Sequence, residues 1–342
     1  MNGQHADFGV GEVGVHLFIG FRGMDLEDEL KELIREYRPG GIVLFRRNIE
    51  GPEQLKNLVA GAQALALEEL GRPVFFAVDQ EGGSVQRLTP HFASIPSASE
   101  LAGQGPEAVR QWAAKCAADL KQIGIQINFA PVLDIVADGG KHFMGSRSFG
   151  ATPAIVSDLG TVWIETLQAN GISATAKHFP GLGRAELDPH HFSPVIADKG
   201  MEGFYHDLIP FAAAMRAGVN CVMTSHAVYP AVDPAWPATL SEEINVRWLR
   251  QHLGFEGVLF GDDLDMAAIS DNYSPEEIVS RGLSCATDFF LLCQKAESIE
   301  PMYRALTDQL NRDSDLRQFH FDTVERVEML RRFHFGERGC RT

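Results

Sequence analysis

Residues 177–192, KHFPGLGRAELDPHHF, are unusually rich in side chains that can transfer protons or bind polar ligands. The stretch contains three histidines, two acids, a lysine and an arginine, and its glycines and prolines disfavour a helix or a central strand. Asp188 lies two residues before His190, where a carboxylate can orient an imidazole ring and raise its pKa. The spacing predicts a loop that carries a proton-transfer dyad, Asp188 and His190.

A second group of acids, Asp262, Asp263 and Asp265, follows directly on the apolar run VLFG. Like charges this close repel one another unless cations, a metal or water face some of them. We expect Asp263 or Asp265 to cap a helix. Because side chains alternate along a strand, we expect only one of Asp262 and Asp263 to face the protein interior. An ionised carboxylate at this position is either a metal ligand or a nucleophile.

Other polar residues also follow apolar runs. The segments concerned are DQEGGSVQR (79–87), DGGKHFMGSRSFG (138–150) and SHAVYP (225–230). Alone, each side chain has an ordinary explanation, such as a turn cap for Asp79, a solvated position for Arg87 or Arg147, and a structural role for His226. Lys177 ends an apolar run, where a charge needs a partner or water. Because these side chains all follow apolar runs that we read as strands, we expect them to lie together on one functional face of the protein.

The apolar runs themselves predict eight strands, each followed by a stretch with helical spacing. Strands apolar on both faces indicate a parallel sheet covered by helices. We therefore predict an α/β fold of the TIM type, a (β/α)8 barrel, as a single domain over 1–342, with its core at about 13–310 and a helical extension to 342. An open dinucleotide-binding sheet is disfavoured, since no GxGxxG follows the first strand. The predicted strands are 13–19, 41–45, 74–79, 125–130, 172–177, 219–224, 257–262 and 288–293.

Composition narrows the possible partners and compartment. The 342 residues are 45% hydrophobic and 22% charged, with a formal net charge of −16, which argues against a nucleic-acid partner. No run of about 18 apolar residues is present to span a membrane. Five cysteines without a CxxC pair favour a reducing compartment, and the N-terminal residues lack a secretory pattern. We expect a cytoplasmic protein, while its oligomeric state stays open.

The motifs DQEGGSVQRL, NFAPVLDI, GSRSFG, KHFPGLG, Asp-x-His and GFEGVLFGDDLDM resemble, in the same order, those of glycoside hydrolase family 3. The resemblance is to the single-domain bacterial β-N-acetylglucosaminidases of cell-wall recycling. It implies Asp262 as nucleophile and Asp188 with His190 as the acid/base dyad, without a metal or cofactor. The resemblance also implies five sugar-binding residues: Asp79, Arg87, Arg147, Lys177 and His178.

The implied reaction is retaining exo-hydrolysis of terminal β-linked N-acetylglucosamine from muropeptides or chitin-type glycosides through a glycosyl-aspartate intermediate. The chain departs from the family pattern at Leu182, Arg184-Ala185, Gly261 and Ser84, and the changed loop leaves the aglycone open.

Other activities remain open. One alternative is a β-glucosidase or glycoside phosphorylase of the same family. Another is a sugar-binding barrel without catalysis. A third is a metal-dependent barrel hydrolase; its candidate ligands are His178, His190, His191, His226 and Asp262.

Overall fold

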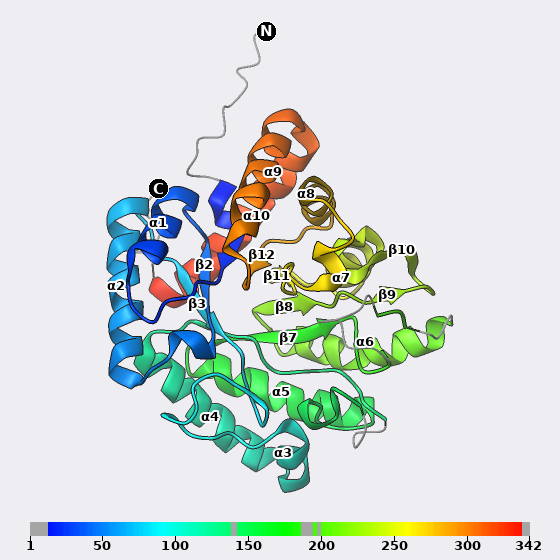
Figure 1. The fold of residues 1–342 in the computed structure, drawn as a ribbon. Coiled ribbons are helices and arrows are strands. Elements are labelled where there is room, and N and C mark those ends of the chain that lie inside the picture. Colours follow the sequence, from blue (N-terminus) through cyan, green and yellow to red (C-terminus); the bar gives the residue numbers. More distant parts are fainter. Residues whose placement is uncertain (1–12, 138–141, 186–193, 197–199, 337–342) are drawn as a thin grey trace.

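The computed structural model describes residues 13–137, 142–185, 194–196 and 200–336. Eight parallel strands form one sheet in the order β11-β8-β7-β6-β3-β2-β1-β12, and a parallel bridge between Phe260 and Phe289 joins its two ends. The predicted barrel is therefore confirmed (Figure 1). The strands are β1 (Leu17–Ile19), β2 (Gly41–Leu44), β3 (Phe75–Val78), β6 (Ile127–Asn128), β7 (Ser173–Phe179), β8 (Cys221–Thr224), β11 (Val258–Gly261) and β12 (Phe290–Leu292).

Each predicted strand region contains an observed strand, usually shorter by one to four residues, and two of the differences change the structure around the site or the core. The first four residues of the first predicted strand form the 3-10 helix η1 (Val13–His16), so β1 has only three residues. Strand β7 instead extends through Lys177 and His178 to Phe179, and all of its residues are buried. The longer β7 carries two of the predicted sugar-binding residues inside the barrel.

Helices surround the strands on the outside (Figure 1). Several begin with strong sequence signals, such as the capping boxes of Ser97 with Glu100 and of Ser274 with Glu277. No described helix is long and apolar enough to cross a membrane. The helices are α1 (Asp28–Tyr37), α2 (Pro52–Leu70), α3 (Ala98–Gln104), α4 (Pro106–Ile123), α5 (Pro153–Ala169), α6 (Met201–Arg216), α7 (Ala267–Ser270), α8 (Pro275–Ser284), α9 (Ile299–Arg312), α10 (Ser314–Phe335) and the π-helix η5 (Glu243–His252).

Short elements fill the connections. They are the hairpin strands β4 (Gln80–Gly82) with β5 (Val85–Gln86) and β9 (Val228–Tyr229) with β10 (Asp233–Pro237), and the 3-10 helices η2 (Arg46–Asn48), η3 (Gly145–Arg147), η4 (Ala238–Leu240) and η6 (Ala296–Ser298). The two hairpins follow β3 and β8, at the end of the barrel where the strands terminate.

Phenylalanines fill the inside of the barrel. Phe18, Phe129, Phe260 and Phe289 pack with ring centroids between 4.9 and 6.4 Å apart, mostly edge to face. Phe129 and the neighbouring Met223 also line the pocket described below. The aromatic core therefore supports that pocket from beneath.

Candidate active site

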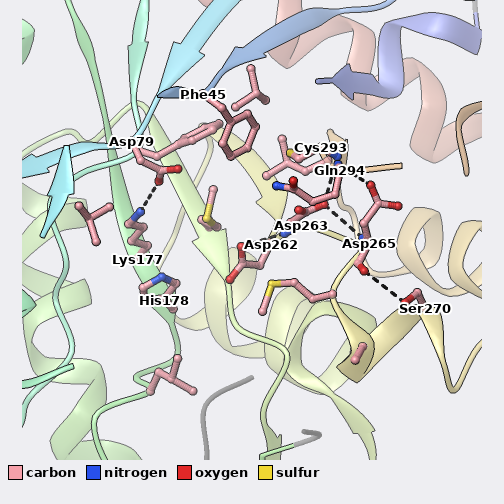
Figure 2. A pocket seen from close by; sticks show the side chains of 18 of the residues that line it. Phe45, Asp79, Lys177, His178, Asp262, Asp263, Asp265, Ser270, Cys293 and Gln294 are labelled. Atoms are coloured by element: carbon pink, nitrogen blue, oxygen red, sulfur yellow. Dashed lines mark hydrogen bonds and ion pairs between the residues drawn. The ribbon is translucent and has the colours of Figure 1, made fainter. Parts of the chain in front are cut away.

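A pocket of about 780 Å³ opens where the strands end, which is where barrel enzymes place their active sites. Its volume is in the range of ligand-binding cavities. Six of the predicted functional side chains line it: Asp79, Arg87, Arg147, Lys177, His178 and Asp262. Figure 2 shows Asp79, Lys177 and His178 on one side of Asp262, and Asp265 and Ser270 on the other. The predicted functional face thus contains one pocket, although the predicted segment 225–230 contributes none of its lining residues.

The β4–β5 hairpin brings the first of these residues together. Gly82 and Gly83 have φ values of +109° and +57°, which glycine adopts without strain, and they turn the chain back on itself. The Gln80 side chain accepts hydrogen bonds from the Arg87 and Leu88 backbone amides. As a result, Arg87 Nη2 lies 3.2 Å from Asp79 Oδ2.

A buried ionic network connects this hairpin with β7. Lys177, only 2% exposed, donates to Asp79 Oδ1 at 2.8 Å and lies 2.7 Å from Glu81 Oε1. Arg147 contacts both Glu81 oxygens at 2.8 Å, in the bidentate geometry that guanidinium and carboxylate groups favour. Two carboxylates therefore compensate the buried Lys177 and the half-buried Arg147, across elements distant in sequence.

The network keeps its members charged. Burial alone would raise the pKa of Glu81, but Arg147 and Lys177 outweigh burial and lower it to about 2. Burial acts the same way on Asp79, and Lys177 and Arg87 hold its pKa well below the usual value. For Lys177, burial would lower the pKa, yet the two carboxylates raise it. The pocket wall thus presents fixed charges at neutral pH.

His178 is held from behind by a second buried carboxylate. Its Nδ1 lies 2.7 Å from Asp134 Oδ2, and because a carboxylate only accepts, Nδ1 carries the hydrogen. Asp134 Oδ1 also accepts the backbone amides of His178 at 3.3 Å and Leu182 at 2.6 Å. This arrangement fixes the imidazole and turns Nε2 toward Arg147, 3.5 Å from its Nη2.

Asp262 directly follows the end of β11 and is half-buried. Its Oδ1 accepts the backbone amide of Asp263 at 2.8 Å. Burial would raise the pKa of Asp262, but His226, His178, that amide and Lys177 together lower it. Asp262 is therefore an ionised carboxylate that faces the pocket (Figure 2).

The neighbouring acids, Asp263 and Asp265, do not have the helix-capping role that the sequence suggested. Neither Asp263 nor Asp265 caps a helix, because α7 begins after Met266 without a side-chain cap. Instead, Asp263 Oδ1 accepts the amides of Asp265 and Cys293, and Asp265 Oδ2 accepts those of Gln294 and Lys295. Because β11 ends at Gly261, strict alternation does not apply, and Asp262 and Asp263 both line the pocket. Burial, with Asp265 and Asp262 nearby, raises the pKa of Asp263 to about 7.

The predicted dyad, Asp188 and His190, lies outside the described residues, as does His191. Of the other candidate metal ligands, His226 contacts Thr239 and the Asp263 carbonyl oxygen. The described part of the chain contains no group of three or more His, Cys, Asp or Glu side chains arranged to hold a metal ion.

Two important residues, Glu81 and Asp134, were missed by the sequence analysis. Both lie inside the quoted motifs, Glu81 in DQEGG and Asp134 in NFAPVLDI. A sequence signal existed for Glu81, since it lies two residues after Asp79 and a strand places such residues on one face. Asp134 follows β6 in an otherwise apolar segment, where a buried carboxylate requires a partner.

Comparison with known sequences gives matches over nearly the whole chain. Residues 10–330 match the family described as the Glycosyl hydrolase family 3 N terminal domain. A beta-hexosaminidase of Idiomarina loihiensis is 36% identical over 321 residues, which cover 92% of this chain and 92% of that protein. A beta-hexosaminidase of Alkalilimnicola ehrlichii is 34% identical over 327 residues, which cover 93% of this chain and 91% of that protein.

Solved structures give the same result. A glycoside hydrolase family 3 beta-N-acetylglucosaminidase from Paenibacillus superposes with a TM-score of 0.90 at 34% identity, covering 97% of this chain and 64% of that one. A beta-N-acetylhexosaminidase from Beutenbergia cavernae superposes with a TM-score of 0.88 at 29% identity, covering 95% and 99% of the two chains.

Proposed function

The chain belongs to glycosyl hydrolase family 3, and from this premise we propose that it is a retaining exo-β-N-acetylglucosaminidase with Asp262 as its nucleophile. The matched family and the named relatives make the protein a glycoside hydrolase of the β-N-acetylhexosaminidase type. The observation that carries the proposal is the ionised Asp262 carboxylate opposite a wall of fixed charges in one pocket.

In the first step, one Asp262 oxygen attacks the anomeric carbon, and the bond from that carbon to the leaving oxygen breaks. A nucleophile must be unprotonated to attack, and the lowered pKa of Asp262 supplies that form at neutral pH. The Asp263 amide binds Oδ1 of Asp262, and no hydrogen bond from the described residues occupies Oδ2, which we take as the attacking oxygen. The product is a covalent glycosyl-Asp262 intermediate.

The fixed wall supplies the sugar contacts in this proposal. Lys177 has three ammonium hydrogens, and Asp79 and Glu81 are the acceptors recorded for it among the described residues, so one hydrogen is left for a sugar hydroxyl. Arg87 Nε is buried and has no hydrogen-bond partner among the described residues. His178 and Arg147 complete the set. Because the ionic network holds these groups before substrate arrives, binding costs little reorganisation.

We assign the proton transfers to Asp188 and His190. His190 donates a proton to the leaving oxygen in the first step, and Asp188 orients its ring. In the second step His190 takes a proton from water, whose oxygen attacks the anomeric carbon and releases Asp262. This assignment comes from the sequence motif.

The substrate in this proposal is a terminal β-linked N-acetylglucosamine on a muropeptide or chitin-type glycoside. We also propose one domain over residues 1–342 and a cytoplasmic role in peptidoglycan recycling. The single-domain arrangement is supported by the Beutenbergia structure, of which the chain spans 99%. A reducing compartment is supported by the cysteines of the described residues, Cys116, Cys221, Cys285 and Cys293, which are free and buried.

The direct test is hydrolysis of p-nitrophenyl N-acetyl-β-glucosaminide by wild type, Asp262→Asn and a control, Asp158→Asn, which changes an exposed acid of α5. Asp262→Asn should lose a factor on the order of 10³ or more in kcat. The control should stay within about twofold of wild type. An Asp262→Asn enzyme with near wild-type turnover would show that another group is the nucleophile.

A further inference from the structure

Residues 181–185 lead from the end of β7 toward the proposed proton-transfer dyad. The segment is bound to the barrel where it begins. The Tyr229 hydroxyl donates a hydrogen bond to the Gly181 carbonyl oxygen at 3.0 Å, and the Leu182 amide donates to Asp134 Oδ1 at 2.6 Å. The chain therefore enters this segment in a conformation that β9 and the loop after β6 both hold.

A histidine from the loop after β6 binds the other end of the segment. His142 is half-buried, and its Nδ1 accepts the Met144 amide at 3.1 Å, so the ring hydrogen is on Nε2. Nε2 lies 2.6 Å from the carbonyl oxygen of Ala185, which is fully buried, and donates to it. The two hydrogen bonds fix the His142 tautomer and join the loops that follow β6 and β7.

The same imidazole ring also contacts the pocket wall. His142 stacks on Phe143, with ring centroids 4.5 Å apart and 30° between the ring planes. Phe143 lines the catalytic pocket. His142 therefore connects Ala185 with the wall of the pocket.

An ion pair with a buried carboxylate holds the residue next to Ala185. Arg184 Nε donates to Asp207 Oδ2 of α6 at 2.7 Å, and the Asp207 side chain is only 4% exposed. Burial raises the pKa of the Asp207 carboxyl, and the Arg184 guanidinium opposes that shift. Because displacing Arg184 would leave a buried carboxylate without its cation, the pair resists displacement. Arg184 and Ala185 are also positions at which the chain departs from the family pattern.

We propose that His142 and Arg184 are positioning residues for the proton transfers. The proposal rests on the proposed function, because it takes His190, oriented by Asp188, as the acid and base. These two residues are five and three positions beyond Ala185, so the chain reaches them from a point that His142 and Arg184 hold. An acid must lie within hydrogen-bond reach of the leaving oxygen, and a displacement of about 1 Å costs about 100-fold in rate.

The test compares kcat/KM for two N-acetyl-β-glucosaminides, one with a phenyl and one with a dinitrophenyl leaving group. The phenyl group needs a proton from the acid in order to leave, whereas dinitrophenolate leaves without one. His142→Phe keeps a ring against Phe143 and removes the donor to Ala185. It should lower kcat/KM for the phenyl glycoside by about 10- to 100-fold and keep the dinitrophenyl value within about threefold of wild type. A general loss of packing would lower both values together.

Three more variants separate positioning from other effects. His142→Gln keeps an N–H donor of similar reach, so its phenyl kcat/KM should stay within about fivefold of wild type. Arg184→Gln removes the charge that holds the neighbouring residue, so it should reproduce the selective loss on the phenyl glycoside. His252→Phe is the matched control, because it makes the same substitution at an exposed position near the start of β11, at the opposite end of the barrel. Both of its values should stay within about twofold of wild type.

Equal losses on the two glycosides in His142→Phe or in Arg184→Gln, or no loss on either glycoside, would overturn the positioning role of that residue while the hydrolase assignment stands. His190→Ala in the same assay tests the function on which the proposal rests. If wild type cleaves neither glycoside, or if His190→Ala shows no selective loss on the phenyl glycoside, the proposed function fails and the positioning roles fail with it.

Discussion

Replacing Glu81 by Gln removes the carboxylate that Lys177 and Arg147 share while leaving the side-chain volume almost unchanged. Lys177 is buried and Arg147 is half-buried in the ionic network of the pocket wall, and Asp79 alone cannot satisfy them. Glu81→Gln should therefore destabilise the fold and also loosen the pocket wall, which is the proposed sugar-binding surface.

The expected stability loss follows from two independent estimates. Lowering the pKa of Glu81 from 4.5 to about 2 corresponds to about 3 kcal/mol of favourable interaction with the charged form. Breaking one side of a buried ion pair costs about 3–5 kcal/mol. We expect a loss of about 3 kcal/mol at pH 7. A displacement of Lys177 or Arg147 by about 1 Å would also reduce kcat/KM by about 100-fold.

The stabilisation that Glu81 provides depends on pH. Because the pKa of Glu81 is lower in the folded than in the unfolded protein, its stabilisation is complete above pH 4.5 and is lost as the pH falls toward 2. The free energy of unfolding of wild type should therefore fall more steeply below pH 4.5 than that of Glu81→Gln.

Urea unfolding at pH 7 and at several values below pH 4.5 measures both effects, with Glu256→Gln as control. Glu256 is exposed and makes no ion pair with the described residues. If Glu81→Gln matched the Glu256→Gln control in unfolding free energy and in kcat/KM, the carboxylate of Glu81 would not stabilise the fold or the pocket wall.

Three further predictions follow from the site and the core. His190→Ala should lose far more rate on glycosides with poor leaving groups than on activated aryl glycosides, and equal losses in kcat/KM would exclude the acid role. Asp134→Asn should lower kcat/KM for the p-nitrophenyl substrate by about 10-fold or more, because one amide oxygen cannot accept both from His178 Nδ1 and from the His178 and Leu182 amides; unchanged kinetics would contradict this. His16 Nε2 lies 2.9 Å from His320 Nδ1 in the core, and burial lowers their pKa values to about 3 and about 4. Both rings are neutral in the folded protein, whereas in the unfolded chain they take up protons below about pH 6.5. The free energy of unfolding, measured with urea, should therefore fall between pH 6.5 and pH 4, by about 3 kcal/mol for His320 alone. A free energy of unfolding that stays constant over this range would contradict the prediction.

The barrel was predictable because its strands are short apolar runs and the intervening segments have helical spacing. The error at residues 13–16 reflects the same apolar pattern, since a buried 3-10 turn and a buried strand have similar composition. The hydrogen bonds of Asp263 and Asp265 were not predictable, because their amide donors include Cys293, Gln294 and Lys295 on another segment.

The pocket was partly predictable. Asp79, Lys177 and Asp262 were found because charges at the ends of apolar strands are unusual. Glu81 was missed because its partners, Arg147 and Lys177, are 66 and 96 positions away, and nothing local marks the pairing. For His178 the family resemblance implies a sugar contact, but the sequence does not reveal its partner, the carboxylate of Asp134, which is 44 positions earlier.

In the proposed mechanism, Asp262 forms a covalent bond to the sugar. The most direct measurement is intact-protein mass spectrometry after incubation with 5-fluoro-N-acetylglucosaminyl fluoride, followed by peptide mapping. We expect one added fluorosugar on the peptide that contains Asp262, and no adduct on Asp262→Asn. A label on a different residue, or continued turnover of the fluoride with no adduct at any time point, would contradict it.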